Sequence, residues 1–204
     1  MKNKVNKMVI QKNNGITECY VLNKDYMELE EKYKTLLASI EAQKLKKELK
    51  LYDIVNYCNH EWYVIKIEED GVTLMSKITV ANCTYSEINS NDWKDSTVVI
   101  KCLEFIKKME NDDLISMKTN YDENKYSYDL VRIPTLREIE AMPMNIRECG
   151  DAYWTMTSSY GVSEGFKHYY VFVVNSNGYL GNDTVDFTYG VRPVIKIRKD
   201  CLNE

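Results

Sequence analysis

The sequence lacks the signals of membrane, nucleic-acid-binding and nucleotide-binding proteins. No apolar run approaches the roughly 20 residues of a membrane-spanning helix, so we expect no membrane insertion. The formal net charge of −4 gives no cationic field for nucleic acid, and neither a P-loop nor a G-x-G-x-x-G motif is present. The basic start, Met1 to Lys7, precedes no apolar segment, so we expect no signal peptide and a chain that is cytoplasmic when made.

Metal-binding and catalytic patterns are also missing from the sequence. The six cysteines form no C-x-x-C pair and have no histidine at metal-ligand spacing, which predicts reduced, mostly buried thiols. The histidines are His60 and His168, and no serine or cysteine nucleophile with an evident orienting group pairs with His168. We therefore expect no catalytic residue, no metal and no cofactor.

Tyrosine, in contrast, is abundant, with 16 residues against three tryptophans and four phenylalanines. Tyrosine suits recognition surfaces because it offers rigid, amphipathic contact area at low entropic cost. It also favours half-buried strand positions, so composition favours neither interpretation.

The N-terminal quarter of the chain predicts an arm followed by a helix. Residues 1–24 are typical of an extended arm, with a turn signal at Asn13-Asn14-Gly15; either a small hairpin or an arm that orders on a partner fits the pattern. Residues 25–50 predict an amphipathic helix, with Asp25 as its N-cap and Glu28 at the capping-box position.

The apolar residues of this helix step by four, three and four, as in a heptad seam: Leu29, Tyr33, Leu36 and Ile40. The seam fits a helix that packs on the domain core. It also fits a short coiled coil that makes the chain a homo-oligomer through residues 25–50.

Residues 51–204 predict a single α+β domain. The segment 61–76 predicts a β-hairpin that turns at Asp70-Gly71, and residues 84–95 predict a surface loop. Ser96 or Thr97 then caps a helix whose apolar stripe is Val99, Leu103 and Ile106. Residues 111–128 are polar again, with Asp, Asn, Lys and Tyr dominating.

The last part of this domain carries further turn and strand signals. Thr135 to Glu138 is a capping box, and Pro143 stops the short helix that it starts. Tyr169 to Val174 predicts a central strand followed by a type I′ turn at Asn177-Gly178. The final strand alternates from Val191 to Arg198, with Pro193 placing part of it at an edge or bulge.

Five segments carry a resemblance to a known domain family, in the same order along the chain. They are Leu51–Ser76, Arg132–Ile139 (RIPTLREI), Tyr153–Ser158 (YWTMTS), Tyr170–Gly181 and Tyr189–Val194 (YGVRPV). This pattern resembles an uncharacterised C-type-lectin-like domain of low-GC bacteria and their phages. The resemblance covers roughly residues 51–198 and departs from the family where its "Y-W-x-R-S" arginine gives way to Met156 or Thr157.

The resemblance implies a C-type-lectin-like fold with small, mainly antiparallel sheets and two helices, preceded by the N-terminal helix. The fold is shared with formylglycine-generating enzymes and with the variable proteins of diversity-generating retroelements. Calcium-dependent sugar binding is not expected, because the paired acid and amide ligands are missing. An oxidase is not expected either, because neither Cys149 nor Cys201 lies on the strand that carries the copper-binding pair.

The polar and aromatic surface of the C-terminal third is therefore the predicted ligand-binding site, while Trp154 and Phe172 are predicted to fill the core. The predicted ligand-binding residues are Tyr153, Ser158, Ser159, Tyr160, His168, Tyr179, Asn182, Asp183 and Tyr189. The loop 161–167, in a Gly-Ser context, is expected to be exposed.

The leading hypothesis is a non-enzymatic module that binds a protein or a surface glycan. The resemblance and the small size favour a phage or prophage origin and a virion-associated fibre or decoration protein. The alternative is a structural or assembly protein whose first 50 residues dock onto a larger particle. A formylglycine-generating type of oxidase ranks below both.

Overall fold

The protein is a mixed α+β chain whose small sheets are mostly antiparallel. A computed structural model describes residues 5–12, 15–44, 49–109, 113–122, 125–159 and 169–202, with the backbone only for 5–12, 15–25 and 39–44. Within these residues it contains four α-helices. None of the described helices has the length and apolar character to cross a membrane.

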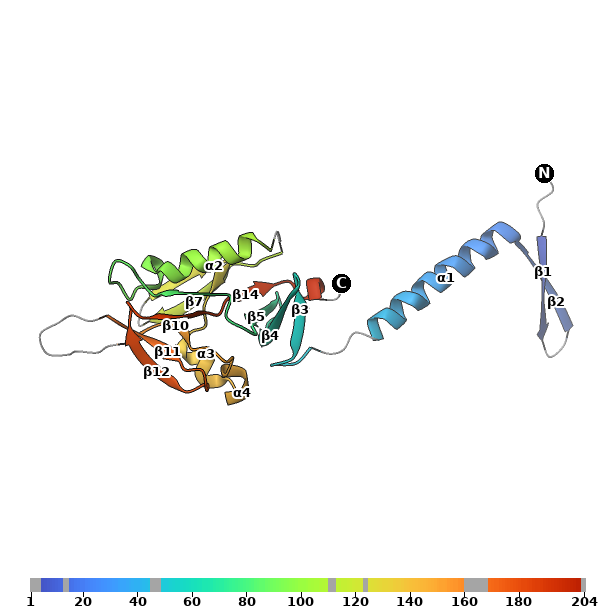
Figure 1. The fold of residues 1–204 in the computed structure, drawn as a ribbon. Coiled ribbons are helices and arrows are strands. Elements are labelled where there is room, and N and C mark those ends of the chain that lie inside the picture. Colours follow the sequence, from blue (N-terminus) through green and yellow to red (C-terminus); the bar gives the residue numbers. More distant parts are fainter. Residues whose placement is uncertain are drawn as a thin grey trace, which may run out of the picture. The chain divides into compact units, whose positions relative to one another are not determined.

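The chain divides into two compact units, residues 1–48 and residues 49–204. In the first unit (blue in Figure 1), β1 (Val5–Lys12) pairs antiparallel with β2 (Gly15–Leu22), so the arm is a hairpin. The predicted turn residues Asn13 and Asn14 lie outside the described residues.

Helix α1 (Asn23–Lys44) begins two residues before the predicted N-cap and does not reach Lys50. Its seam residues Leu29, Tyr33 and Leu36 are 66%, 61% and 57% exposed. The side chain of Ile40 lies outside the described part of the helix. The described seam is therefore exposed.

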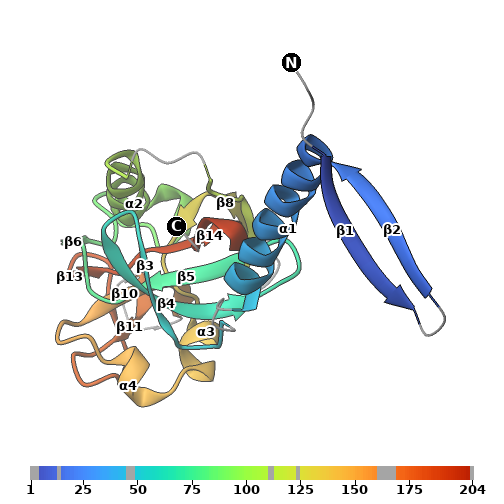
Figure 2. The same cartoon turned by 90° about the vertical axis from the view of Figure 1, so that its right-hand side faces the viewer.

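The second unit contains two five-stranded sheets, seen from two sides in Figures 1 and 2. The first has the order β3 (Ile54–Tyr57), β4 (His60–Ile67), β5 (Val72–Ser76), β14 (Val194–Ile197) and β9 (Val131–Arg132). The pairing of β4 with β5 confirms the predicted hairpin around Asp70-Gly71.

The second sheet has the order β12 (Leu180–Thr184), β11 (Tyr170–Val174), β10 (Tyr153–Ser159), β13 (Thr188–Val191) and β6 (Ala81–Thr84). Its neighbours are antiparallel except for β10 and β13. The predicted strand around Tyr170 is confirmed as an interior strand. The turn after it is not of type I′, because Gly178 has a positive φ of 82° while Asn177 does not.

The predicted final strand is in fact two strands in different sheets. β13 ends at Val191 and β14 begins at Val194, so Arg192-Pro193 carries the chain from one sheet to the other. All four residues of β14 are buried because the strand lies between β5 and β9, which explains why its two faces do not alternate in burial. Pro193 therefore interrupts the strand instead of lying on its edge.

The helices of the second unit are α2 (Thr97–Lys107), α3 (Leu136–Ala141) and α4 (Met144–Arg147). The caps are as predicted: Ser96 accepts from the Val99 N–H, and Thr135 and Glu138 form a capping box. The predicted stripe of α2 is confirmed in part, because Val99 and Ile106 are partly buried against the main core. Val98 and Cys102 are buried, whereas Leu103 is 51% exposed.

Two polar stretches, of which the first was predicted to be a surface loop, contain ordered structure. Residues 84–95 include a 3₁₀ turn (Trp93–Asp95) and bury Tyr85 and Trp93. Residues 111–128 include β7 (Met117–Asp122), which pairs with β8 (Lys125–Asp129) in a hairpin of its own. A second 3₁₀ turn (Lys199–Leu202) follows β14.

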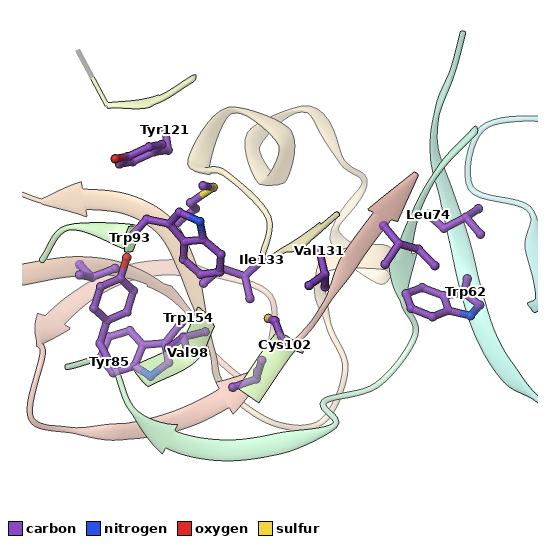
Figure 3. Close-up of a cluster of buried hydrophobic side chains, with 14 of the residues drawn as sticks. Trp62, Leu74, Tyr85, Trp93, Val98, Cys102, Tyr121, Val131, Ile133 and Trp154 are labelled. Atoms are coloured by element: carbon purple, nitrogen blue, oxygen red, sulfur yellow. The ribbon is translucent and has the colours of Figure 1, made fainter. Parts of the chain in front are cut away.

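The main core lies among these elements (Figure 3). Trp93, Tyr85 and Trp154 are grouped at one end, and Trp62 and Leu74 lie at the other. All five are buried. The prediction that Trp154 fills the core is confirmed, whereas Phe172 is only half-buried because it lies on the opposite face of β11.

Candidate ligand-binding groove

Two adjoining hollows run along β7 in the second unit. The larger, of about 620 Å³, is lined by Asn120, Tyr121, Asp122, Lys125, Tyr126, Thr135, Leu136, Arg137, Glu140 and Thr157. The smaller, of about 450 Å³, is lined by Lys66, Glu68, Asp70, Thr73, Ser116, Met117, Lys118, Thr119, Asn120, Arg132, Thr135, Glu138 and Lys196. Asn120 and Thr135 line both hollows. We therefore treat the two hollows as one feature, the β7 groove.

The β7–β8 hairpin forms one wall and is fixed by polar contacts to Asp92. Tyr121 donates its hydroxyl to Asp92 at 3.0 Å, and Lys125 lies 3.2 Å from the same carboxylate. Burial alone would raise the pKa of Asp92, but hydrogen bonds from the Lys94 N–H, Lys125 and Tyr121 hold it below its usual value. Asp92 is thus held as an anion that anchors the hairpin.

The opposite wall is built around the start of α3. Glu138 receives two hydrogen bonds from Arg132, at 2.6 and 2.8 Å, and also accepts from the Thr135 N–H. The Arg132 guanidinium outweighs the effect of burial and lowers the pKa of Glu138. This wall is rigid because one carboxylate serves both as helix cap and as ion-pair partner.

A second ion pair closes the far end of the groove. Lys196 Nζ lies 2.8 Å from both carboxylate oxygens of Asp70 and 3.0 Å from Glu68. Burial alone would lower the pKa of Lys196, but the hydrogen bonds that it donates to these carboxylates raise it. Lys196 is therefore satisfied within the protein.

The open part of the groove carries side chains that have few contacts of their own. The Tyr126 ring is 50% exposed, and Lys118 Nζ lies 4.9 Å from its centroid. Arg137 and Glu140 are exposed and make no ion pair with any residue that the structure describes. Aromatic, cationic and anionic groups thus face the same solvent-filled space.

One of the predicted site residues, Tyr153, is not a surface residue. It has no exposed area, donates its hydroxyl to the Arg147 carbonyl at 2.9 Å and receives a hydrogen bond from Arg192. Burial raises its pKa to about 12, although Arg192 acts in the opposite direction. The prediction of a ligand contact at Tyr153 is wrong, because β10 turns this ring into the smaller core.

The structure brings four of the other predicted residues together in two pairs. Asn182 donates to Ser159 Oγ at 3.0 Å, and Tyr189 donates to Asp183 at 2.6 Å. The hydrogen bond to Asp183, together with burial, raises the pKa of Tyr189 to about 12. Ser159 is buried, so Asn182 is the exposed member of the first pair.

The remaining predicted residues are scattered. Tyr179 is 60% exposed and contributes to neither pair. Ser158 is buried and donates its hydroxyl to Asp122 at 2.7 Å, so it supports the β7 groove from behind. Tyr160 and His168, with the loop 161–167, lie outside the described residues.

The groove residues on β7 and β8 are not among the predicted site residues, because residues 111–128 are polar and contain no apolar run. A signal was present in the sequence, since Met117, Thr119 and Tyr121 alternate with Lys118 and Asn120. Their burial follows the same period of two. Thr119 is only weakly apolar, so the alternation of apolar and polar residues is hard to recognise in the sequence.

The structure also places His60 beside a serine. His60 Nε2 lies 2.7 Å from Ser76 Oγ, but Ser76 is buried and donates its own hydrogen to the Ile78 carbonyl. Ser76 therefore accepts a hydrogen bond from His60, which is the reverse of the polarity that activates a nucleophile. Within the described residues, no three His, Cys, Asp or Glu side chains are placed to hold a metal ion.

Comparisons of the chain with protein-family models, with curated proteins and with solved structures found no match.

Proposed function

We propose that residues 49–204 adopt a C-type-lectin-like fold and form a non-enzymatic binding module. The support for the fold is the order of the five sequence segments, together with the passage from one sheet to the other at Arg192-Pro193, inside the YGVRPV segment. The resemblance further supports a phage or prophage origin and a virion-associated role, with a protein or a surface glycan as the ligand.

One observation carries the proposed binding function. The β7 groove, whose larger hollow has a volume of about 620 Å³, combines ion-paired walls with an exposed tyrosine, arginine and glutamate at its opening. A ligand site typically joins concave shape to a few convergent polar groups. Exposed tyrosine adds contact area at low entropic cost.

The matched variants Tyr126→Ala and Tyr179→Ala test this assignment, because each removes one exposed tyrosine from the second unit. Binding is measured on host cells, a glycan array and a surface-protein array. We expect Tyr126→Ala to weaken binding about tenfold or more, as a central aromatic contact does, and Tyr179→Ala to leave it unchanged. Loss of binding in the Tyr179→Ala variant alone would place the ligand-binding site on the predicted surface around β12. No binding on any array would contradict the module itself.

A second function, assembly onto a larger particle, is favoured by the first unit. Its helix exposes Leu29, Tyr33 and Leu36 on one seam, although apolar seams are normally covered in a working assembly. In this proposal residues 1–48 dock or oligomerise and residues 49–204 face outward. Substitutions in the seam would then remove the chain from the particle while ligand binding through the second unit stays intact.

A further inference from the structure

The β7 groove runs along the edge of its strand. Successive side chains of a strand point to opposite faces, so a groove on one face is lined by every second residue. Here every residue from Ser116 to Asp122 lines the groove, in one hollow or the other. A groove that follows the edge of a strand borders consecutive residues in this way.

From Ser116 to Tyr121 that edge is unpaired within the described part of the chain. β7 belongs to a two-stranded sheet and pairs there with β8. Just before it, the Ile115 N–H donates to the Lys196 carbonyl at 2.7 Å, after which β7 leaves β14. Apart from the ladder to β8, no backbone hydrogen bond joins residues 116–121 to another described segment. A free strand edge presents N–H and C=O groups that can pair with a further strand.

We propose that the β7 groove binds an extended segment of a partner polypeptide, which adds to the free edge of β7 as a third strand. This inference rests on the proposed binding function and names its ligand class. The six residues of β7 span about 20 Å, which matches an extended segment of about six residues. Main-chain hydrogen bonds supply affinity in this mode, and alternate side chains supply specificity.

The charges along the groove select the kind of segment. Lys118 and Arg137 face it without a carboxylate partner in the described structure, whereas Glu140 is the acid left without a cation. The other charged groups are engaged in pairs, such as Arg132 with Glu138 and Lys196 with Asp70. The groove therefore favours a segment with acidic side chains. Tyr126 and Leu136 add apolar contact area in the larger hollow, which Arg137 and Glu140 also line.

The probe is a peptide selected on the full-length protein from a displayed library of random twelve-residue sequences. The selected peptide is then synthesised with a single N-methyl group at each position in turn. We expect the loss of affinity to alternate, about tenfold at every second position and small between, because only alternate N–H groups of an added strand face β7. An equal loss of affinity at every N-methylated position would overturn strand addition. So would a peptide whose affinity depends on its side chains and not on its N–H groups.

The matched charge reversals Lys118→Glu and Lys107→Glu locate the peptide, because both lysines are exposed and only Lys118 lines the groove. Lys118→Glu is expected to weaken an acidic peptide about tenfold and Lys107→Glu to have no effect. Equal effects would overturn the assignment to the groove. If only glycans bind, and Tyr126→Ala weakens them, the proposed function stands and the inference of a polypeptide ligand fails.

Discussion

At the scale of single residues, Arg192 is a cation that holds several elements together. It has no exposed area, and its guanidinium donates to the carbonyls of Ser76, Ile146, Arg147 and Lys77 over 2.7 to 3.3 Å. These acceptors lie near β5 and α4, while Arg192 itself stands between β13 and β14. Arginine can do this because its five donors form a rigid, planar fork.

Arg192→Lys should therefore destabilise the protein although it keeps the charge. Lysine has three donors on one nitrogen, so buried carbonyls are left without partners, at a cost of about 3 kcal/mol or more. Arg198→Lys is the matched control, because that side chain is 60% exposed and its ion pair with Asp113 lies at the surface. Urea unfolding of the three proteins measures the difference. Equal unfolding free energies for both variants would contradict the role of Arg192.

His60 should make stability depend on pH. Burial lowers the pKa of His60 from its usual 6.5, since the ring packs against Trp62 and Phe105. The folded state then binds a proton less readily than the unfolded state, so the free energy of unfolding falls as pH drops below about 6.5. His60→Asn should flatten this fall between about pH 7.5 and 5.5, as measured by thermal or urea unfolding. An unchanged slope would show that His60 is not its source.

At the scale of elements, the turn between β11 and β12 illustrates how backbone and packing act together. Gly178 has φ +82°, and a Cβ there would lie 2.7 Å from Met144 Sδ and 3.2 Å from its carbonyl oxygen. Gly150 has a similar φ of +86°, but a Cβ would meet nothing within 4 Å. The two glycines therefore separate conformational strain from steric overlap.

Gly150→Ala is expected to cost about 1 kcal/mol of unfolding free energy, from the left-handed conformation alone. Gly178→Ala should cost at least about 1 kcal/mol more, because α4 must also move away from the turn. Thermal unfolding of the two variants compares them directly. Similar losses of unfolding free energy in the two variants would mean that α4 moves away from the turn at no energetic cost.

The sequence predicted those elements that have strong local signals. The β4–β5 hairpin and the capping box of Thr135 and Glu138 follow from turn and cap chemistry within a few residues. The division of the last strand at Arg192-Pro193 depends on which sheet each half joins, a long-range property that alternation does not encode. The β7 groove also depends on long-range contacts, because β7, α3 and Lys196 meet only in the folded chain.

At the scale of the whole molecule, two units divide the proposed work. Residues 49–204 contain the described core and the β7 groove, whereas the described part of residues 1–48 consists of a hairpin and the helix with the exposed seam. A seam of this length is short for an independent coiled coil, so assembly through it should be sensitive to single charges.

The double variant Leu29→Lys with Leu36→Lys is expected to turn an oligomer into a monomer, because two buried cations cannot be paired within the seam. Its control is Glu31→Lys with Ala38→Lys, which has the same spacing on another, exposed face of the helix. Multi-angle light scattering reports the mass of each form. An oligomer that survives the first double variant, or a monomeric wild type, would contradict assembly through α1.

The central claim is that ligands bind at the free edge of β7, and amide hydrogen exchange tests it most directly. The full-length protein is compared free and saturated with the selected peptide, residue by residue. The account predicts slower exchange at every second amide between Ser116 and Asp122, since only those N–H groups point toward the added strand. Unchanged exchange along β7, with protection instead around β12, would contradict it.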